Sequence, residues 1–332
     1  EVLAAGPDLA RTNRFGGTAL IPAADRGHVE VVRRLLGTAI DVDHVNDLGW
    51  TALLEAVLLG DGGPDHQEIV RLLLAAGAVP DLRDSEGRTA LWRAAQQGHA
   101  AIVERLLAKG ADAGRRDTAG VSPFVAAAGN RHLAVATLLV DRTPDLGPAL
   151  AEAAGAGFLD LVKRLLARKA SPDAVDRTDA SALERAARAG HLDVVATLLD
   201  AGASVTVHGV AALHAAAGAN AVDVVARLLG KGVPVDARDP SKSTPLLRAA
   251  GAGSVEVVAL LLARGADPRA VDAEGRGYAV YMEVRQSFYT AELDRLSRMR
   301  SAPIGAPALQ AELDALRARH AQIRERLAAA VR

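Results

Sequence analysis

Apolar residues follow two alternating patterns along most of this chain. The first is a T-A-L-x-x-A segment, which begins at Thr18, Thr51 and Thr89. The second comes after a Gly-His pair and reads V-V-x-x-L-L, as in the stretch from Val31 to Leu36. Its apolar residues are three and four positions apart, which is the spacing of an apolar stripe along one side of an α-helix. Each pair of segments therefore predicts two short antiparallel helices joined by a turn.

This helix pair is repeated along the chain. The three clearest copies of the first segment are spaced by 33 and 38 residues, and weaker copies continue to Thr244. We count eight copies, which are anchored near residues 18, 51, 89, 122, 148, 181, 211 and 244. One helix pair cannot bury both of its apolar faces, so neighbouring copies must stack on each other. The predicted fold is an all-α solenoid of about eight helix-turn-helix repeats.

The fixed residues of each copy resemble those of ankyrin repeats. Thr89-Ala90-Leu91 corresponds to the start of that family's T-P-L-H-x-A core, and Thr244-Pro245-Leu246 is a variant of it. The resemblance covers roughly residues 1 to 290. It implies β-turn fingers between successive repeats, where endings such as Gly110-Ala111-Asp112 are followed by a D-x-x-G turn. It also implies a partner protein, bound on a concave face that the finger tips and the first helices line.

The expected domain boundaries lie where the repeats lose their regularity. We expect an ankyrin repeat domain over residues 1–276, with a truncated first unit. The fifth copy begins only 26 residues after the fourth, which predicts a missing or shortened finger near residues 141–147. The spacing of 30 residues before the seventh copy predicts another shortened finger at Val205 to Gly209. Residues 277–332 are expected to form a degenerate capping repeat and a C-terminal helix.

An insertion interrupts the second copy. Asp61 to Asp65 stand between its two helices, where the regular copies pass directly from Gly to His. Insertions in repeats map to loops, so one interpretation is a tolerated surface loop. The alternative is a rim that adds contacts to a partner. The run from Thr12 through the insertion to Val70 is similar to a bacterial ankyrin subfamily, which favours the second interpretation without adding any chemistry.

Composition agrees with a stack of closely spaced helices. Hydrophobic residues make up 50% of the chain and aromatic residues only 3%, so Ala, Leu and Val must form the core. The net charge of −1 provides no overall field that would attract nucleic acid or an acidic membrane. The absence of cysteine excludes disulfides, thiolate metal sites and cysteine nucleophiles.

The sequence gives information on the cellular location of the protein only through two features that are missing from it. No apolar run approaches the roughly 20 residues that span a bilayer, and no signal peptide stands at the start. We therefore expect a cytoplasmic protein that does not enter a membrane. The chain begins without Met and inside a repeat. We accordingly expect that its original N-terminus is missing, which leaves open a signal that was removed.

The histidines form no chemical site in the sequence. Five of the nine occupy one repeated position just after the turn between the helices, namely His28, His66, His99, His132 and His191. A residue that recurs with the repeat belongs to the scaffold. The chain has no metal-ligand spacing, no phosphate-binding glycine loop and no serine elbow. The sequence therefore predicts no metal, no cofactor and no enzyme activity.

Residues that line the concave face are expected to carry the specificity, because they escape the structural consensus. In the first three copies they lie at the fingers and at the exposed end of the first helix. The candidates are Arg14, Phe15, Asp25, Arg26, Leu48, Trp50, Leu58, Leu59, Glu86, Arg88, Gln96 and Gln97. Phe15 and Trp50 are the expected anchors, because aromatic residues dominate interface energetics. For Trp50 the alternative is packing against the neighbouring finger.

The last helix carries a different apolar pattern. From about residue 308 to residue 330, apolar residues are spaced alternately by four and three positions, which is a coiled-coil seam. The seam residues are Leu309, Leu313, Leu316, His320, Ile323 and Leu327. Either the C-terminal helices form a hairpin that caps the stack, or the seam pairs with a second chain to make a homodimer.

Taken together, these patterns favour a non-enzymatic scaffold for protein interactions. The expected partner is another protein of unknown identity, and no binding of nucleic acid is expected. Two alternatives stay open. One is an assembly component that dimerises through its C-terminal seam, and the other is the interaction domain of a larger enzyme or effector.

Overall fold

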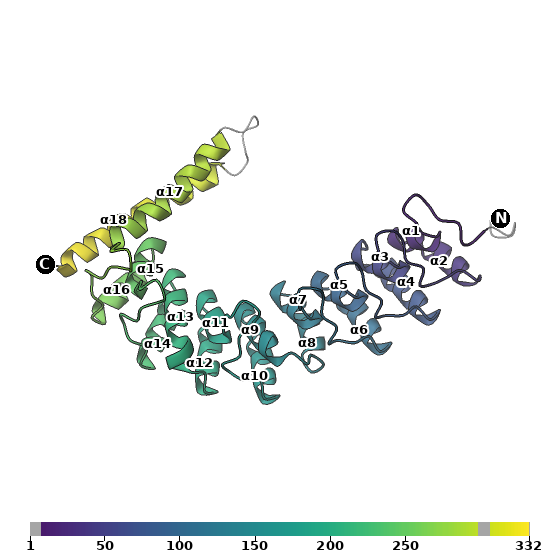
Figure 1. Ribbon diagram of the computed structural model, residues 1–332, viewed down its shortest axis with the longest axis horizontal. Coiled ribbons are helices and arrows are strands. Elements are labelled where there is room, and N and C mark those ends of the chain that lie inside the picture. The colour runs from purple at the N-terminus through teal and green to yellow at the C-terminus, as the bar shows by residue number, and fades with distance from the viewer. Residues whose placement is uncertain (1–7, 298–305, 332) are drawn as a thin grey trace. The chain divides into compact units, whose positions relative to one another are not determined.

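The computed structural model describes residues 8–297 and 306–331, and its secondary structure is helical (Figure 1). Among these residues there is no β-strand, and an isolated bridge joins Val175 to Ser181. The chain forms two compact units, residues 1–149 with 167–169 and residues 150–166 with 170–332. The boundary expected at residues 276 and 277 is not tested by this division and stays a prediction.

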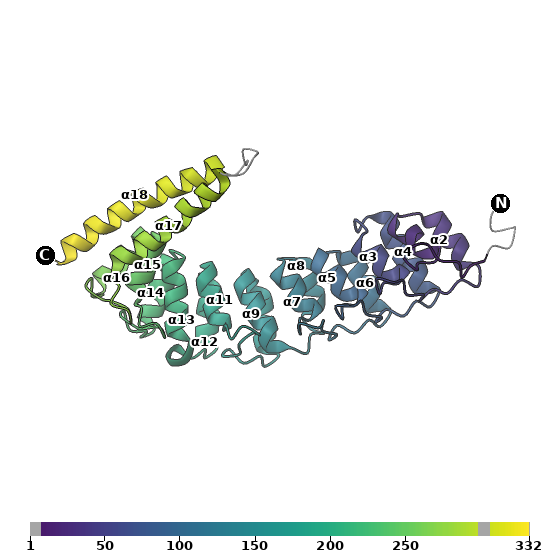
Figure 2. The ribbon, with the colours of Figure 1, turned by 45° about the horizontal axis from the view of Figure 1, so that its top comes forward.

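The described residues of the first unit form four helix pairs. They are α1 (Leu20–Asp25) with α2 (Val29–Leu36), α3 (Ala52–Leu58) with α4 (Pro64–Ala75), α5 (Ala90–Gln97) with α6 (Ala100–Ala108), and α7 (Pro123–Gly129) with α8 (Leu133–Leu139). Odd-numbered helices pack on odd-numbered ones and even-numbered on even-numbered, so the unit has two layers (Figure 2). We call these layers the inner and the outer helices.

The second unit continues the same arrangement, and the division between the units falls within its first helix. Its helices are α9 (Leu146–Ala156), α10 (Leu159–Ala167), α11 (Ala182–Ala189), α12 (Leu192–Asp200), α13 (Val205–Gly218), α14 (Val222–Gly230), α15 (Pro245–Ala252), α16 (Val255–Ala263), α17 (Tyr278–Ser297) and α18 (Ala306–Val331). Eight helix pairs therefore precede a longer C-terminal pair, and the predicted all-α solenoid is confirmed.

A Ser or Thr hydroxyl caps the start of six inner helices, which are α3, α5, α7, α11, α13 and α15. In α5, Oγ1 of Thr89 accepts the backbone N–H of Trp92 at 3.2 Å, which satisfies a donor that the first turn leaves free. Leu91 and Ala95 then point into the core and are fully buried. The helix ends at Gly98, whose φ of 80° is the left-handed geometry that favours glycine. Local sequence thus determines both ends of the helix.

The repeated histidines connect adjacent repeats. Nε2 of His132 lies 2.9 Å from the carbonyl oxygen of Gln96, at the end of the preceding inner helix. Nε2 of His66 lies at the same distance from the carbonyl oxygen of Asp25. These contacts satisfy carbonyl groups that helix ends leave without an internal partner. The structural role predicted for this position is confirmed at these two residues.

Two repeats depart from the finger pattern in different ways. In the fifth repeat α9 begins at Leu146, so the chain enters the inner helix without a finger. In the seventh repeat a shortened finger was expected at Val205 to Gly209, and this prediction is wrong. The segment is the first part of α13, whose start is capped by Ser204 Oγ accepting the N–H of Val207 at 3.2 Å. A serine cap followed by residues compatible with a helix makes helix the better structure there.

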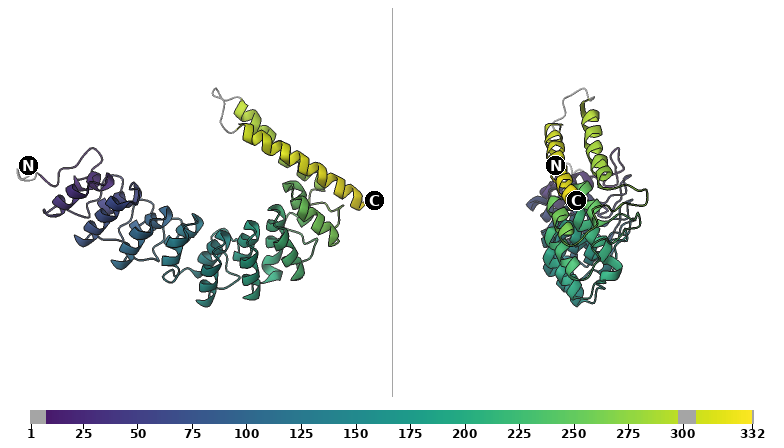
Figure 3. Two further views of the ribbon diagram at one scale, coloured as in Figure 1. Left: turned by 180° about the vertical axis from the view of Figure 1, so that it is seen from behind. Right: turned by 90° about the vertical axis from the view of Figure 1, so that its left-hand side faces the viewer.

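The C-terminal helices form a hairpin on the last repeat (Figure 3). Helix α17 packs against α15 and α18, and α18 also packs against α16. Five seam residues are buried in this hairpin, namely Leu313, Leu316, His320, Ile323 and Leu327, while Leu309 is half-buried. Within one chain the hairpin thus packs on the last repeat, and pairing of the seam with a second chain stays a prediction.

Candidate functional site

Each finger is a tight turn that an Asn or Asp side chain holds together. In the third finger, residues 84–88, Oδ1 of Asp84 accepts the backbone N–H groups of Glu86 and Arg88, both at 2.9 Å. The side chain satisfies two donors that the turn would otherwise leave to water. Asn46 does the same in the second finger. The fingers are therefore rigid projections rather than loose loops.

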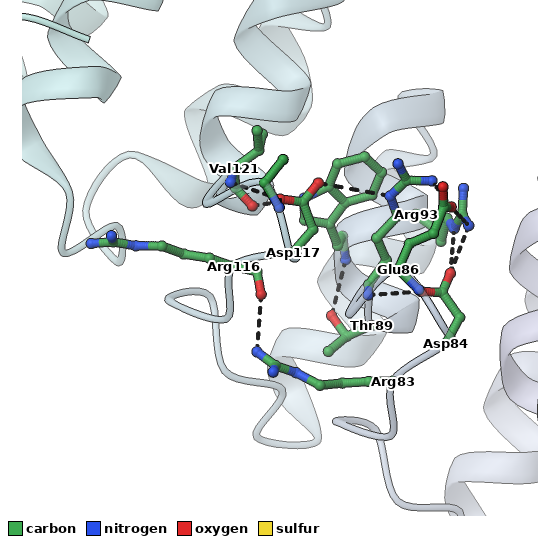
Figure 4. A network of polar contacts seen from close by, with 11 residues as sticks. Arg83, Asp84, Glu86, Thr89, Arg93, Arg116, Asp117 and Val121 are labelled. Carbon is green, nitrogen blue, oxygen red and sulfur yellow. Dashed lines mark hydrogen bonds and ion pairs between the residues drawn. The ribbon is translucent and has the colours of Figure 1, made fainter. Parts of the chain in front are cut away.

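The third finger is also connected to the inner helix α5 (Figure 4). Oδ2 of Asp84 lies 2.6 Å from Nη2 of Arg93, and Glu86 Oε2 lies 3.0 Å from the same nitrogen. The indole N–H of Trp92 donates to the carbonyl oxygen of Val121 in the following finger at 2.9 Å. Because Trp92 is buried and bonded in this way, it belongs to the scaffold. Together these contacts fix the finger relative to its helix and to the next finger.

In the second repeat this connection has a different charge. Asn46 takes the place of the aspartate, and Glu55 takes the place of Arg93. The amide of Asn46 donates to Oε1 of Glu55 at 3.1 Å. Glu55 is only 6% exposed, so burial raises its pKa, and the Asp25 carboxylate raises it further, while the hydrogen bond from Asn46 lowers it in part. Glu55 is thus a buried acid that makes no ion pair with the described residues.

Apolar side chains stand at the tips of the first two fingers. Phe15 and Leu48 occupy equivalent positions and are 48% and 49% exposed. The N–H of Asp47 donates to the carbonyl oxygen of Phe15 at 2.9 Å, which joins the two tips. The guanidinium carbon of Arg14 lies 4.6 Å from the Phe15 ring centroid, within the range of a cation–π contact. The third finger has Glu86 at this position, so the apolar tips end there.

The C-terminal end of α3 presents two leucines. Leu58 is half-buried, and Leu59 is 53% exposed. The side-chain amide of Gln97 donates to the carbonyl oxygen of Leu58 at 2.8 Å, so the neighbouring helix supports this end. The equivalent ends of the α1 and α5 segments carry Asp25, Arg26, Gln96 and Gln97. The leucines therefore have polar neighbours on both sides.

The insertion of the second repeat is an anchored loop. Oδ1 of Asp61 accepts the N–H of Gly63 at 2.8 Å and lies 2.9 Å from Nδ1 of His66, and both contacts lower the pKa of Asp61. The other ring nitrogen of His66 contacts the first repeat at Asp25. Helix α4 begins inside the insertion at Pro64, so the last inserted residues extend the outer helix. The loop accordingly has a fixed position beside Leu58 and Leu59.

None of the candidate residues of the concave face is buried, and they fall into an exposed and a half-buried group. Arg14, Phe15, Arg26, Leu48, Leu59 and Glu86 are exposed, and Asp25, Trp50, Leu58, Arg88, Gln96 and Gln97 are half-buried. The structure brings the apolar candidates together in two places, the finger tips and the end of α3. These places are separated by the seven residues of α3, about 10 Å along its axis. We call Phe15, Leu48, Trp50, Leu58 and Leu59 the N-terminal apolar surface.

Glu55, a buried acid beside this surface, is the residue that the sequence interpretation missed. It lies on α3, between the finger and the two leucines. A signal for it exists in the sequence, since Asn46 and Glu55 are nine residues apart, as are Asp84 and Arg93, Asp176 and Arg185, and Asp239 and Arg248. Comparing the repeats at this spacing would have shown that one of them carries an acid where others carry an arginine.

Two kinds of feature are absent from the part of the chain that the structure describes. No group of three or more His, Asp or Glu side chains in residues 8–297 and 306–331 is arranged to hold a metal ion. No helix of these residues is both long enough and apolar enough to cross a membrane.

A family model described as ankyrin repeats in three copies matches the chain at residues 1–84, 61–149, 144–209 and 206–272. These matches cover well over half of the chain. They also agree with the helix pairs and the fingers of the structure. The resemblance that the repeated residues indicated is therefore confirmed.

Relatives are similar over shorter stretches. YahD of Escherichia coli, named as an ankyrin repeat protein, is 49% identical over 98 residues, which are 29% of this chain and 49% of that protein. The E3 ubiquitin-protein ligase XBAT33 of Arabidopsis thaliana is 40% identical over 102 residues, 30% of this chain and 19% of that protein. A crystal structure of an ankyrin repeat domain from Acinetobacter baumannii is 56% identical, with 33% of this chain and 56% of that one covered and a TM-score of 0.33. The chain spans about half the length, or less, of these curated relatives.

Proposed function

We propose, since this chain belongs to the ankyrin-repeat family, that it is a non-enzymatic scaffold whose N-terminal apolar surface binds a partner protein. Ankyrin repeats in general mediate interactions between proteins. The observation that carries the more specific proposal is the exposure of Phe15, Leu48 and Leu59 on three supported elements. Large apolar side chains that are about half exposed on one part of a molecule are typical of an interaction site.

The proposed mechanism is the presentation of preformed contacts. The finger tips are held by their Asn and Asp side chains, and the end of α3 is held by Gln97 and by the anchored insertion. Little conformational entropy is then lost when a partner binds, so more of the contact energy remains as affinity. The polar candidates Arg26, Glu86, Arg88 and Gln96 would form the rim of the contact.

An affinity capture from the source lysate, with mass spectrometry, tests this proposal. We compare the chain with a Phe15→Ala and Leu59→Ala double variant. A matched control replaces Val31 and Leu133 by Ala, because these residues are similarly exposed, at 48% and 52%, but lie on outer helices. The expected result is a protein that the chain and the control capture and the double variant loses. Equal capture by all three would move the binding site away from the N-terminal apolar surface.

The two alternative roles lead to different measurements. Dimerisation through the C-terminal seam would require α18 to leave the hairpin that buries Leu316, Ile323 and Leu327. A role as the interaction domain of a larger enzyme or effector is compatible with the same N-terminal apolar surface. That role would be recognised from a catalytic domain encoded in the same gene.

A further inference from the structure

We propose that the partner segment bound by the N-terminal apolar surface is basic as well as apolar. In this arrangement a Lys or Arg side chain of the partner pairs with Glu55 and Asp25, while a neighbouring apolar side chain packs on Leu58 and Leu59. The inference rests on the proposed function, because it specifies the chemistry of a partner at the same surface.

The first observation is that the charge of Glu55 is not compensated within the chain. At the equivalent position of other repeats, the charged residue is paired. Arg93 lies 2.6 Å from Asp84, Glu152 lies 3.1 Å from Arg185, and Arg248 lies 3.0 Å from Asp239. Among the described residues Glu55 receives only the neutral amide of Asn46. It is therefore the exception in a row of charges that are otherwise balanced.

A second acid lies beside it. Asp25, at the end of α1, is close enough for its carboxylate to act on Glu55. The side chain of Asp25 makes no ion pair in the described part of the chain, and it is half-buried. Two carboxylates thus lie near each other, one at the end of α1 and one on α3, and neither makes an ion pair with the described residues.

None of the nearby arginines pairs with Glu55 or Asp25 in the described part of the chain. Arg93, on the next inner helix, is held by Asp84 and Glu86. Arg14 lies over the ring of Phe15 at the finger tip. Arg26 is exposed and forms no ion pair with the described residues. A buried negative charge without a partner lowers the stability of the chain, and a cation supplied from outside would offset that cost.

The apolar residues around Glu55 favour a partner segment in which the basic residue has apolar neighbours. Leu58 and Leu59 follow Glu55 by three and four residues on the same helix, so they lie on the same side of α3 one turn away. Leu48 and Trp50 lie at the opposite end of the helix, in the finger. A basic side chain over Glu55 would therefore be flanked by apolar groups. The segment that fits has a Lys or Arg within about one turn of a Leu, Phe or Trp.

Selection of random 12-residue peptides displayed on phage, with the immobilised chain as bait, tests the inference. Binding of the enriched peptides is then measured by fluorescence anisotropy. We expect enriched peptides to combine a Lys or Arg with a large apolar residue. A Glu55→Gln and Asp25→Asn double variant should bind them roughly tenfold more weakly or worse, as expected for close charge pairs. Glu104→Gln, an exposed acid on the outer helix α6, is the control that should leave their affinity unchanged.

The outcomes separate the inference from the proposed function. The Phe15→Ala and Leu59→Ala variant identifies peptides that bind at the N-terminal apolar surface. If such peptides lack basic residues, or bind the double carboxylate variant as well as the chain, the inference is overturned and the proposed function stands. If no peptide depends on Phe15 or Leu59, both are overturned. Circular dichroism of each variant ensures that a loss of binding is not a loss of fold.

Discussion

At the scale of single residues, the position nine places after the finger Asn or Asp determines how a repeat balances its charges. An aspartate with an arginine, as in Asp84 and Arg93, makes a short ion pair that is nearly buried. An asparagine with a glutamate, as in Asn46 and Glu55, keeps the hydrogen bond but leaves a charge. The geometry of the finger is the same in both cases. The difference is electrostatic, and it is where this chain departs from its own pattern.

Replacing Glu55 by Gln should therefore stabilise the free chain at neutral pH. Burial first, and then the Asp25 carboxylate, raise the pKa of Glu55 above its ordinary value. An acid whose pKa is raised by folding destabilises the fold when it is ionised, and this cost disappears as the pH falls through the raised pKa. The variant should have the higher melting temperature at pH 7, with the difference shrinking towards pH 4. Thermal melts by circular dichroism at several pH values measure this.

The same experiment has a clear contrary result. Equal melting temperatures at pH 7, or a variant that is less stable at every pH, would show that Glu55 is satisfied in the free chain. Glu104→Gln, which changes an exposed acid on the outer helix α6, is the control for the change in net charge. Its melting temperature should stay close to that of the unchanged chain throughout the pH range.

Residue patterns predicted the scaffold well and the surface less well. Leu91 and the repeated histidines recur with the period, so their structural roles follow from comparing the copies. Trp50 does not recur, and the sequence could not decide between a free anchor and a packed side chain; the structure has it half-buried. Glu55 was missed because its neighbour Asn46 still fits the finger consensus. The missing charge compensation is visible only when the finger residue and the residue nine places after it are compared together between repeats.

At the scale of elements, an inner helix such as α5 depends on its hydroxyl cap and its buried leucine. Leu91 is fully buried in α5 between α3 and α7. Leu91→Ala removes a core side chain that rigid neighbouring helices cannot replace, and we expect it to lower the free energy of unfolding by about 2–5 kcal/mol. Val79→Ala is the matched control, because Val79 is 46% exposed. Its expected effect is within about 0.5 kcal/mol. Urea denaturation compares the two, and similar losses would contradict the assigned core.

The hairpin of α17 and α18 should respond to mild acid. His320 is fully buried, with Nδ1 2.8 Å from Nε2 of Gln286 and Nε2 3.3 Å from the carbonyl oxygen of Gly251. Burial lowers the pKa of His320, and Arg324 and Arg319 lower it further, although the contact to Gly251 raises it in part. A histidine whose pKa is lowered by folding destabilises the fold as the pH falls below its ordinary value of about 6.5.

Hydrogen exchange of α18 as a function of pH measures this response. We expect protection in α18 to fall between about pH 6.5 and pH 5 in the unchanged chain. In a His320→Leu variant, which places an ordinary seam residue there, we expect protection to be greater and independent of pH in this range. The helices α11 and α12 serve as an internal reference within the same unit. If α18 lost protection equally in both chains, another group would be responsible.

The regular helices were predictable because the same residues recur at the same positions of each repeat. The irregular segments were not, because one or two residues outside the repeat pattern determine their structure. The repeat spacing predicts a short finger from Val205 to Gly209, but a helix in place of the finger would give the same spacing. What decides between them is Ser204, which caps α13. Pro240 gives a second local signal. In other fingers the residue at this position donates its backbone N–H to the preceding finger, as Asp47 and Ala273 do. The finger that contains Pro240 has no finger before it, so a proline, which has no N–H group, fits there.

At the scale of the whole molecule, stability in a repeat stack depends on nearest neighbours. A change at one end should weaken the adjacent repeats and leave distant ones unaffected. The structure allows a direct test, because α18 contacts α15, α16 and α17 and belongs to the second unit. A chain that lacks residues 306–332 should therefore exchange amide hydrogens faster in α15, α16 and α17. The helices α1 to α6 should be unchanged, and they provide the reference.

Light scattering of the same two chains decides what the C-terminal seam does. Because Leu313, Leu316, Ile323 and Leu327 are buried within their own chain, the full chain is expected to have the mass of a monomer. The shortened chain loses the helix that packs on α15, α16 and α17. It should consequently be monomeric but less stable, or prone to aggregate. A full chain with twice the monomer mass that becomes monomeric on shortening would instead establish pairing through the seam, and the hairpin would then have to exchange α18 between two copies.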